Sequence, residues 1–271
     1  MLVIVGAGGV VLYRLAKGTI QEFEDVGRAM SDLRTEYGEV RDFTPPLSGE
    51  IPAERLEAFL EVRAATRPAR DEIRELLGTL ESEIAGFDSG GEGSVWGILS
   101  AIRRGAGTIP KLAKFHQTRA DALLERGMGL GEYEYIYVLA FYSWLGKSPG
   151  DGPKFLRLGD HNDVSWNPDH HPEDAEEQRR VQVTRRIRSN FQAFFRNALS
   201  VADSDEPRAN REWLAAVERE LIELESRWDR IPWRDGMPAV TEDSLRAFGE
   251  RIEDSYDELN NVLEMIAPGG P

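Results

Sequence analysis

The chain has 271 residues, of which 41% are hydrophobic, enough to bury one sizeable core or two smaller ones. Its formal charge of −15 argues against nucleic acid as a partner and against a broad electrostatic attachment to anionic lipid. The sequence contains no cysteine, which excludes disulfides, thiolate catalysis and cysteine-ligated metals.

The first stretch is the most apolar of the chain. In residues 2–16 only Arg14 is charged, and a helical period of apolar residues then continues without proline to Tyr37. We expect one long helix over residues 1–37, with its first half in the bilayer and its second half packed on an extramembrane domain. The apolar run is slightly short for a bilayer core of about 30 Å, but basic flanking side chains can reach the headgroups. The residues expected to contact lipid are Leu2, Val3, Ile4, Val5, Val10, Val11, Leu12 and Tyr13.

Small residues interrupt this anchor. Gly6, Ala7, Gly8 and Gly9 would let another transmembrane helix approach closely. The same residues imitate the glycine turn of a dinucleotide-binding unit, but Val11 occupies the third glycine position. No acidic residue ends a second strand about 20 positions later, so we expect no nucleotide.

The remainder of the chain divides at proline-rich and glycine-rich stretches. Residues 38–51, with Pro45 and Pro46, form a linker that cannot continue a helix. Residues 52–146 are expected to form a helical subdomain, with breaks at Pro68, at the glycine-rich residues 86–94 and near Gly105. Residues 147–174 are a long polar loop, and residues 175–271 are a second helical region. Its helices are expected at 175–202, at 211–230 and from Thr241 to about residue 266.

The fold class expected is therefore all-α. An N-terminal transmembrane helix continues into an extramembrane helical bundle, built as one body or as two helical subdomains. The segment Tyr133–Leu145 is too short to span a bilayer and contains Glu134, so we expect a buried core helix there. Its aromatic side chains would also suit a partner surface.

Three short motifs resemble a known group of proteins. They are Phe-Thr-Pro-Pro at residues 43–46, Leu-x-x-Phe-Leu-x-Val-Arg at residues 56–63 and Met-x-Leu-x-Glu-Tyr at residues 128–133. Residues 10–145 are similar to uncharacterised bacterial proteins that have an N-terminal membrane helix and an extracytoplasmic helical domain. The resemblance implies an envelope location and no particular activity. Basic residues after the apolar run favour a cytoplasmic domain, whereas the resemblance implies a periplasmic one. We expect a single-pass protein of the bacterial inner membrane with a periplasmic domain.

The polar loop holds the best candidates for chemistry. Its imidazoles and carboxylates would suit zinc, manganese or iron; they are His161, His170, His171, Asp163 and Asp169. However, the chain contains no His-Glu-x-x-His motif, no Glu-x-x-His spacing and no EF-hand spacing. It also lacks the Gly-x-Ser-x-Gly turn of serine hydrolases. We therefore predict no metal, no other cofactor and no catalytic residue, and a metal-dependent hydrolase is the least favoured function.

We predict a non-enzymatic accessory or scaffolding subunit of a membrane protein complex. Its partners would be the bilayer and other membrane subunits, contacted through aromatic residues: Tyr133, Tyr137, Trp144, Trp166 and Trp233. The alternative is a helical carrier that binds a lipid or another apolar ligand in the envelope. The basic run from Arg179 to Arg188 would contact phosphate headgroups or pair with acidic residues of the final helices, and we favour the internal pairing.

Overall fold

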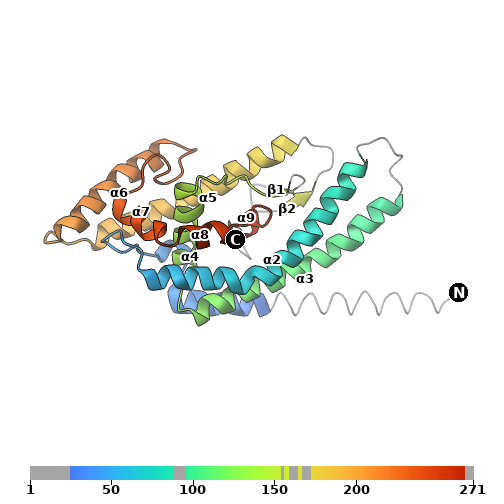
Figure 1. Cartoon of the computed structure of the whole chain (residues 1–271), viewed down its shortest axis with the longest axis horizontal. Coiled ribbons are helices and arrows are strands. Elements are labelled where there is room, and N and C mark those ends of the chain that lie inside the picture. The colour runs from blue at the N-terminus through green and yellow to red at the C-terminus, as the bar shows by residue number, and fades with distance from the viewer. Residues whose placement is uncertain (1–24, 88–94, 154–155, 159–163, 167–171, 266–271) are drawn as a thin grey trace.

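The computed structural model describes residues 25–87, 95–153, 156–158, 164–166 and 172–265 (Figure 1). In these ranges, no helix combines the length and the apolar composition needed to cross a bilayer. The predicted anchor residues at 2–13 lie outside them, so the anchor stays a prediction. Residues 25–37 are helical and bury Val26, Met30 and Leu33, as expected of the second half of the N-terminal helix.

The described chain is helical apart from one small hairpin, which confirms the predicted all-α class. The helices are α2 (Ala53–Phe87), α3 (Val95–Glu125), α4 (Leu130–Tyr137), α5 (Pro172–Val201), α6 (Arg208–Ser226), α7 (Ala239–Arg246), α8 (Gly249–Ser255) and α9 (Asn261–Met265). A 3-10 turn, η1 (Val40–Asp42), precedes α2, and a π-helix, η2 (Val138–Trp144), continues α4. In the predicted polar loop, β1 (Leu156–Leu158) pairs antiparallel with β2 (Val164–Trp166).

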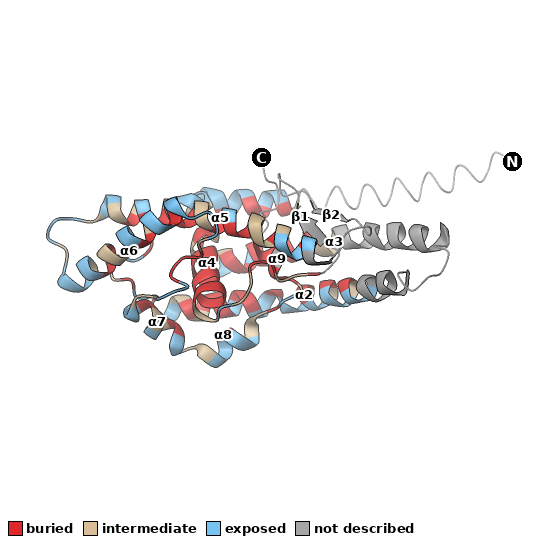
Figure 2. Cartoon of the chain, turned by 90° about the horizontal axis from the view of Figure 1, so that it is seen from above, coloured by how far each residue is buried: buried red, intermediate tan, exposed pale blue. Residues whose placement is uncertain are grey.

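Two antiparallel helical pairs flank a central element. Helices α2 and α3 form one pair, α5 and α6 form the other, and α4 with η2 lies between the pairs (Figures 1 and 2). Helices α7 and α8 pack against η2, and α8 also packs against α2. Buried residues from both predicted subdomains, from Val26 to Met265, belong to a single core cluster.

Two of the predicted helix breaks were wrong. Helix α2 continues through Pro68, and α3 continues through Gly105 and Pro110. An interior proline costs a helix about 3 kcal/mol, because it lacks an N–H and its ring crowds the preceding turn. Helices α2 and α3 pack along each other, and most helical stability in proteins comes from such packing and not from local propensity.

The opposite error occurred near the C-terminus, where one predicted helix is three short ones. The helix predicted to start at Thr241 begins earlier, at Ala239. Thr241 is therefore buried inside α7, and its hydroxyl donates to the Gly49 carbonyl at 2.8 Å. Helix α8 begins at Gly249, whose backbone lies so close to Trp144 that a Cβ would be 3.1 Å from the indole. The helix is therefore interrupted between α7 and α8, where the chain contacts Trp144 of η2.

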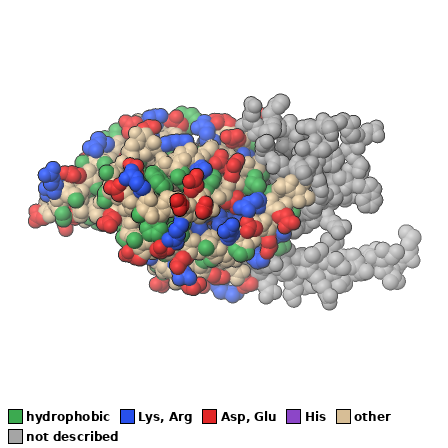
Figure 3. Space-filling model, viewed as in Figure 1, with side chains coloured by type: hydrophobic (Ala, Val, Ile, Leu, Met, Phe, Trp, Pro, Cys, Tyr) green, Lys and Arg blue, Asp and Glu red, His purple; other side chains and the backbone are tan. Residues whose placement is uncertain are grey.

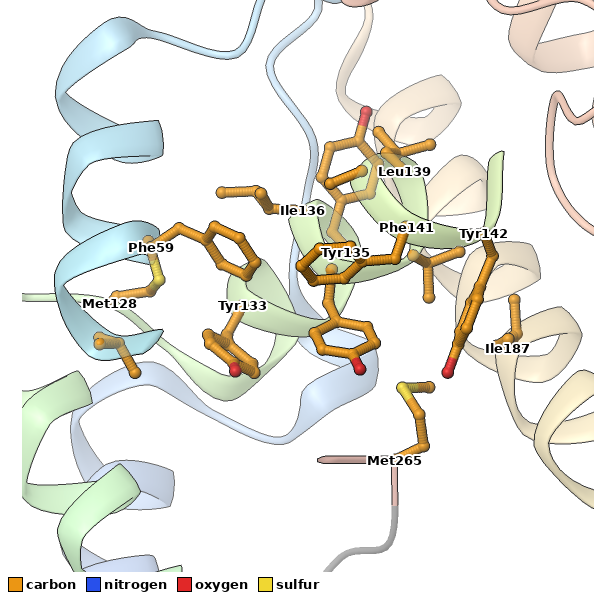
Figure 4. Packing of buried hydrophobic residues seen from close by; sticks show 14 of the residues in the cluster. Phe59, Met128, Tyr133, Tyr135, Ile136, Leu139, Phe141, Tyr142, Ile187 and Met265 are labelled. Carbon is orange, nitrogen blue, oxygen red and sulfur yellow. The ribbon is translucent and has the colours of Figure 1, made fainter. Parts of the chain in front are cut away.

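The position of α4 and η2 in the interior explains why the segment Tyr133–Leu145 is so apolar. Nearly every side chain from Tyr133 to Ser143 is buried, and the labelled rings in Figure 4 point into one core between the two helical pairs. A helix that is apolar all round belongs in a protein interior, so the prediction of a buried core helix is confirmed. The π-helical turns bond farther along the chain than α-helical ones, as in the bond from the Leu145 N–H to the Ala140 carbonyl at 3.1 Å.

Candidate functional site: a groove beside helix α6

Helix α6 has a conventional inward face. Trp213, Val217 and Leu224 are buried against the rest of the bundle at helical spacing. Ile222 follows Trp213 by nine residues, which places it on the opposite side of the helix at about 100° per residue. Its side chain is accordingly 63% exposed. An isoleucine on the outer face of a charged helix is a candidate contact residue.

A groove of about 520 Å³ lies between α6 and the segment that leads to α7. Its lining residues are Ala216, Arg219, Glu220, Ile222, Glu223, Trp233, Gly236, Met237 and Pro238. Arg219 follows Ala216 by three residues and precedes Glu223 by four, so the three residues form a stripe beside the inward face of α6. The groove is therefore apolar on one wall and carries charges on the other.

Glu220 holds the wall opposite α6 in place. Its carboxylate accepts two hydrogen bonds from Arg230, both at 2.7 Å, and a third from the Trp233 backbone N–H at 3.1 Å. Only 6% of the Glu220 side chain and 11% of the Arg230 side chain are exposed. The hydrogen bonds to Glu220 raise the pKa of Arg230 above its ordinary value. The groove wall is thus fixed before any ligand arrives.

Trp233 has an unusual backbone at this wall. Its φ of +53° is the only positive φ of a non-glycine residue in the described part of the chain. Such a conformation costs about 1–3 kcal/mol and persists only where the surroundings enforce it. Here the indole packs on Phe195 at 4.9 Å and on Trp213 at 6.3 Å between ring centroids. Strained residues concentrate at functional sites, which makes this wall a candidate one.

The ionisable side chains of the lining are those of Arg219, Glu220 and Glu223. Glu220 is already engaged by Arg230. The remaining charged groups, Arg219 and Glu223, have opposite signs, so they would orient a bound segment.

A second apolar side chain is exposed just after α6. Trp228 is 57% exposed, and the guanidinium of Arg180 lies 6.0 Å from its ring centroid. Charged residues of both signs surround the scattered apolar ones over the face seen in Figure 3. Tryptophan, tyrosine and arginine are the residues most enriched at the centres of protein interfaces. Trp228 with Arg180 is therefore a further candidate contact.

Most of the aromatic residues predicted to contact partners are not at the surface. Trp233 is 3% exposed but lines the groove beside α6, so its prediction as a partner contact stays a prediction. Tyr133 and Tyr137 are fully buried, so these two predictions were wrong. Their rings fill the core, because the central element is enclosed on every side. Trp144 is half-buried against Gly249. Trp166 ends β2, and its side chain lies outside the described residues.

The candidate metal ligands of the polar loop stay a prediction. His161, His170, His171, Asp163 and Asp169 lie outside the described residues. Elsewhere, within the described ranges, no three His, Asp or Glu side chains are grouped so that they could hold a metal. The start of the loop is fixed by the buried Arg179, which donates to the carbonyls of Gly150 at 2.9 Å and Pro153 at 2.7 Å.

Two arginines of the basic run on α5, Arg180 and Arg186, pair with acids within the chain, but not with the predicted acids of the final helices. Arg180 bonds to Glu177 at 2.7 and 2.6 Å, one turn away. Arg186 bonds at 2.6 Å to the buried Glu134 of the central element. The expected partners in the final helices are not used by these two arginines.

The groove was not predicted from the sequence. Ile222 was a detectable signal, because it falls outside the apolar stripe of its own helix. On the opposite wall, Trp233 was among the predicted partner contacts, but the position of the loop over residues 233–238 cannot be read from periodicity. Comparison of the chain with protein-family models, with curated proteins and with solved structures found no match.

Proposed function

We propose that this chain is a non-enzymatic accessory subunit of a membrane protein complex, and that the groove beside α6 binds a short segment of a partner subunit. Residues 2–13 would hold the domain at the bilayer. The observation that carries the proposal is the 63% exposure of Ile222 at a preformed groove. Fully desolvated apolar anchors supply most of the binding energy in protein interfaces.

The partner segment should present one large apolar side chain to the groove. A volume of about 520 Å³ is within the range of roughly 300–1,000 Å³ typical of ligand sites. Glu223 and Arg219 on the rim would fix the orientation of the segment. Because the chain carries a charge of −15, association would be fastest with a basic partner.

A lipid carrier is less well supported by this groove. Carrier sites enclose about 70–90% of the ligand surface, whereas the apolar side chain at this groove is largely open to solvent. A docking site needs no such enclosure, because the partner itself covers the exposed apolar surface.

Site-specific photocrosslinking in native membranes tests the proposal. A photoreactive phenylalanine analogue replaces Ile222 in one full-length chain and Val201 in another. Val201 is a matched control, because it is also an exposed aliphatic residue, at 54%, and does not line the groove. The Ile222 chain should crosslink to one peptide of a membrane partner, and the Val201 chain should not. Equal crosslinking from both positions, or none from Ile222, would count against the groove.

A further inference from the structure

The short C-terminal helix α9 inserts a carboxylate into the middle of the bundle. Glu264 accepts hydrogen bonds from Arg63 of α2, from Arg119 of α3 at 3.4 Å and from the Tyr133 hydroxyl at 3.0 Å. The side chains of Glu264, Arg63 and Arg119 are each 1% exposed. Arg119 also donates to the Glu264 backbone carbonyl at 2.9 Å. A single residue of α9 therefore joins three other helices.

Two asparagines at the start of α9 are bound in the same way. The Asn261 side-chain oxygen accepts hydrogen bonds from Tyr137 at 2.9 Å and from Tyr142 at 2.7 Å. The Asn260 amide donates to the Arg70 carbonyl at 2.9 Å. These contacts come from side chains of the α9 segment and not from a shared backbone ladder. The bundle thus recognises this segment as a binding site recognises a peptide.

We define the socket as the groups that receive α9: Arg63, Arg70, Arg119, Tyr133, Tyr137 and Tyr142. The socket holds three buried guanidiniums and, among the described residues, bonds to one carboxylate, that of Glu264. Arg70 donates to the carbonyls of Ser255 at 3.2 Å and Arg63 at 2.6 Å. The Nε atoms of Arg63 and Arg70 are buried, and the described part of the chain offers them no hydrogen-bond partner. Buried charges need compensation, so the socket strongly favours an anionic group.

The pKa shifts of His116 and Glu264 agree with the positive charge of the socket. Burial and the adjacent Arg119 lower the pKa of His116, whose Nδ1 lies 3.2 Å from the Arg119 guanidinium. Burial alone would raise the pKa of Glu264, but Arg63, Arg119 and Arg70 together lower it. The carboxylate is therefore ionised when α9 is seated.

Helix α9 also makes apolar contacts with the core. Leu263 and Met265 are its buried apolar residues in the described set. A helix of five residues is not stable by itself, because its nucleation cost is not recovered over so short a length. The segment before it leaves α8 through Tyr256, which has an extended backbone with ψ of 143°. The polar fit to the socket and the burial of Leu263 and Met265 together hold α9 in place.

We propose that the socket is a recognition site for an acidic helical turn and that α9 of a second copy of this chain can replace the chain's own α9, giving a reciprocal dimer. The α9 segment of one copy would fit the socket of the other, because both copies have the same sequence. Residues 256–260 form the connection that would change direction, and the exchange would first break the bonds from the Tyr256 hydroxyl to Asp151 and from Arg74 to Asp257. The two copies would then make the same Glu264–Arg119 contact between chains that one copy makes within itself.

Mixing two full-length variants tests the exchange. Glu264→Arg removes the acidic group and leaves the socket intact, whereas Arg119→Glu damages the socket and leaves α9 intact. Native mass spectrometry of the equimolar mixture should show a heterodimer that neither variant forms alone, because the intact α9 of one copy fills the intact socket of the other. A mixture that stays monomeric while both variants are folded by circular dichroism would overturn the proposal.

The wild-type chain gives an independent result if either variant fails to fold. A fluorescent peptide of residues 256–265 is titrated against the full chain in detergent, beside the same peptide carrying Glu264→Gln. We expect saturable binding of the native peptide and at least tenfold weaker binding of the variant. The absence of saturable binding, or equal binding of both peptides, would contradict recognition of the acidic group.

Discussion

The substitution Glu264→Gln tests the strongest electrostatic feature of the fold. The amide keeps the shape of the side chain but removes the charge that Arg63 and Arg119 share at 1% exposure. Breaking a buried ion pair from one side costs about 3–5 kcal/mol. Because the amide oxygen still accepts hydrogen bonds, we expect a loss near the lower value, about 3 kcal/mol. Small domains have a total stability of roughly 5–15 kcal/mol, so the change would be large.

Urea unfolding of the full chain in detergent, followed by circular dichroism, measures this loss. The matched control is Glu57→Gln, because Glu57 also bonds to an arginine, Arg251, at 2.7 and 2.6 Å. That pair is exposed, with 45% and 53% of the two side chains accessible, so its removal should change stability little. If Glu264→Gln unfolds at the same urea concentration as the wild type, the buried carboxylate does not stabilise the bundle and the reasoning fails.

Three further predictions concern single side chains. Tyr135→Phe should raise stability by about 1 kcal/mol in urea unfolding, because the buried Tyr135 hydroxyl has no hydrogen-bond partner among the described residues; a loss would mean that it has one. Gly49→Ala should lower the free energy of unfolding by roughly 2–4 kcal/mol in the same assay, since Gly49 has φ of +72° and the new Cβ would lie 2.0 Å from Trp213. A variant as stable as the wild type would refute this close packing. His116 has a pKa lowered below 6.5 by burial and by Arg119, so only the unfolded state gains its proton as the pH falls below about 6.5. Stability should then decline by up to about 1.4 kcal/mol per pH unit, and His116→Gln should reduce this decline; an unchanged slope in urea midpoints between about pH 7.5 and 5.5 would contradict it.

Much of the fold could be predicted, because the apolar residues of an amphipathic helix recur with the period of the helix. The helix expected at 175–202 is α5, Pro172–Val201, and the one expected at 211–230 is α6, Arg208–Ser226. Breaks were harder to predict, because tertiary packing overrides local signals. Pro68 lies inside a helix that packs along a long neighbour, whereas the helix break after Arg246 falls at Ala247 and Phe248, directly before Gly249.

The buried ionic groups followed a rule that the sequence analysis did not apply. Arg63 lies four residues after Phe59 and seven after Leu56, on the inward stripe of α2. Arg119 and Glu220 occupy equivalent inward positions on α3 and α6. A charged residue on an apolar stripe therefore predicts a buried ion pair. Its partner cannot be predicted, because Glu264 is far away in sequence and only the fold brings the two together.

The groove could be predicted only in part. Ile222 departs from the apolar stripe of α6, and this was visible in the sequence. The opposite wall depends on Glu220 holding Arg230 and on the left-handed backbone of Trp233, and neither contact follows from composition or spacing. The partner-contact residues chosen for their aromatic character were mostly core residues, because large apolar side chains serve both purposes.

Native mass spectrometry of the complex solubilised from its own membranes tests the central proposal most directly. Wild-type chain and the control variant Val201→Glu should each be recovered with a membrane partner in fixed ratio, and Ile222→Glu should lose at least nine-tenths of that partner. This loss corresponds to about 1.4 kcal/mol of binding energy, which is modest for an apolar anchor at an interface. Recovery of the wild-type chain as a lone monomer, or equal retention of the partner by both variants, would contradict the account.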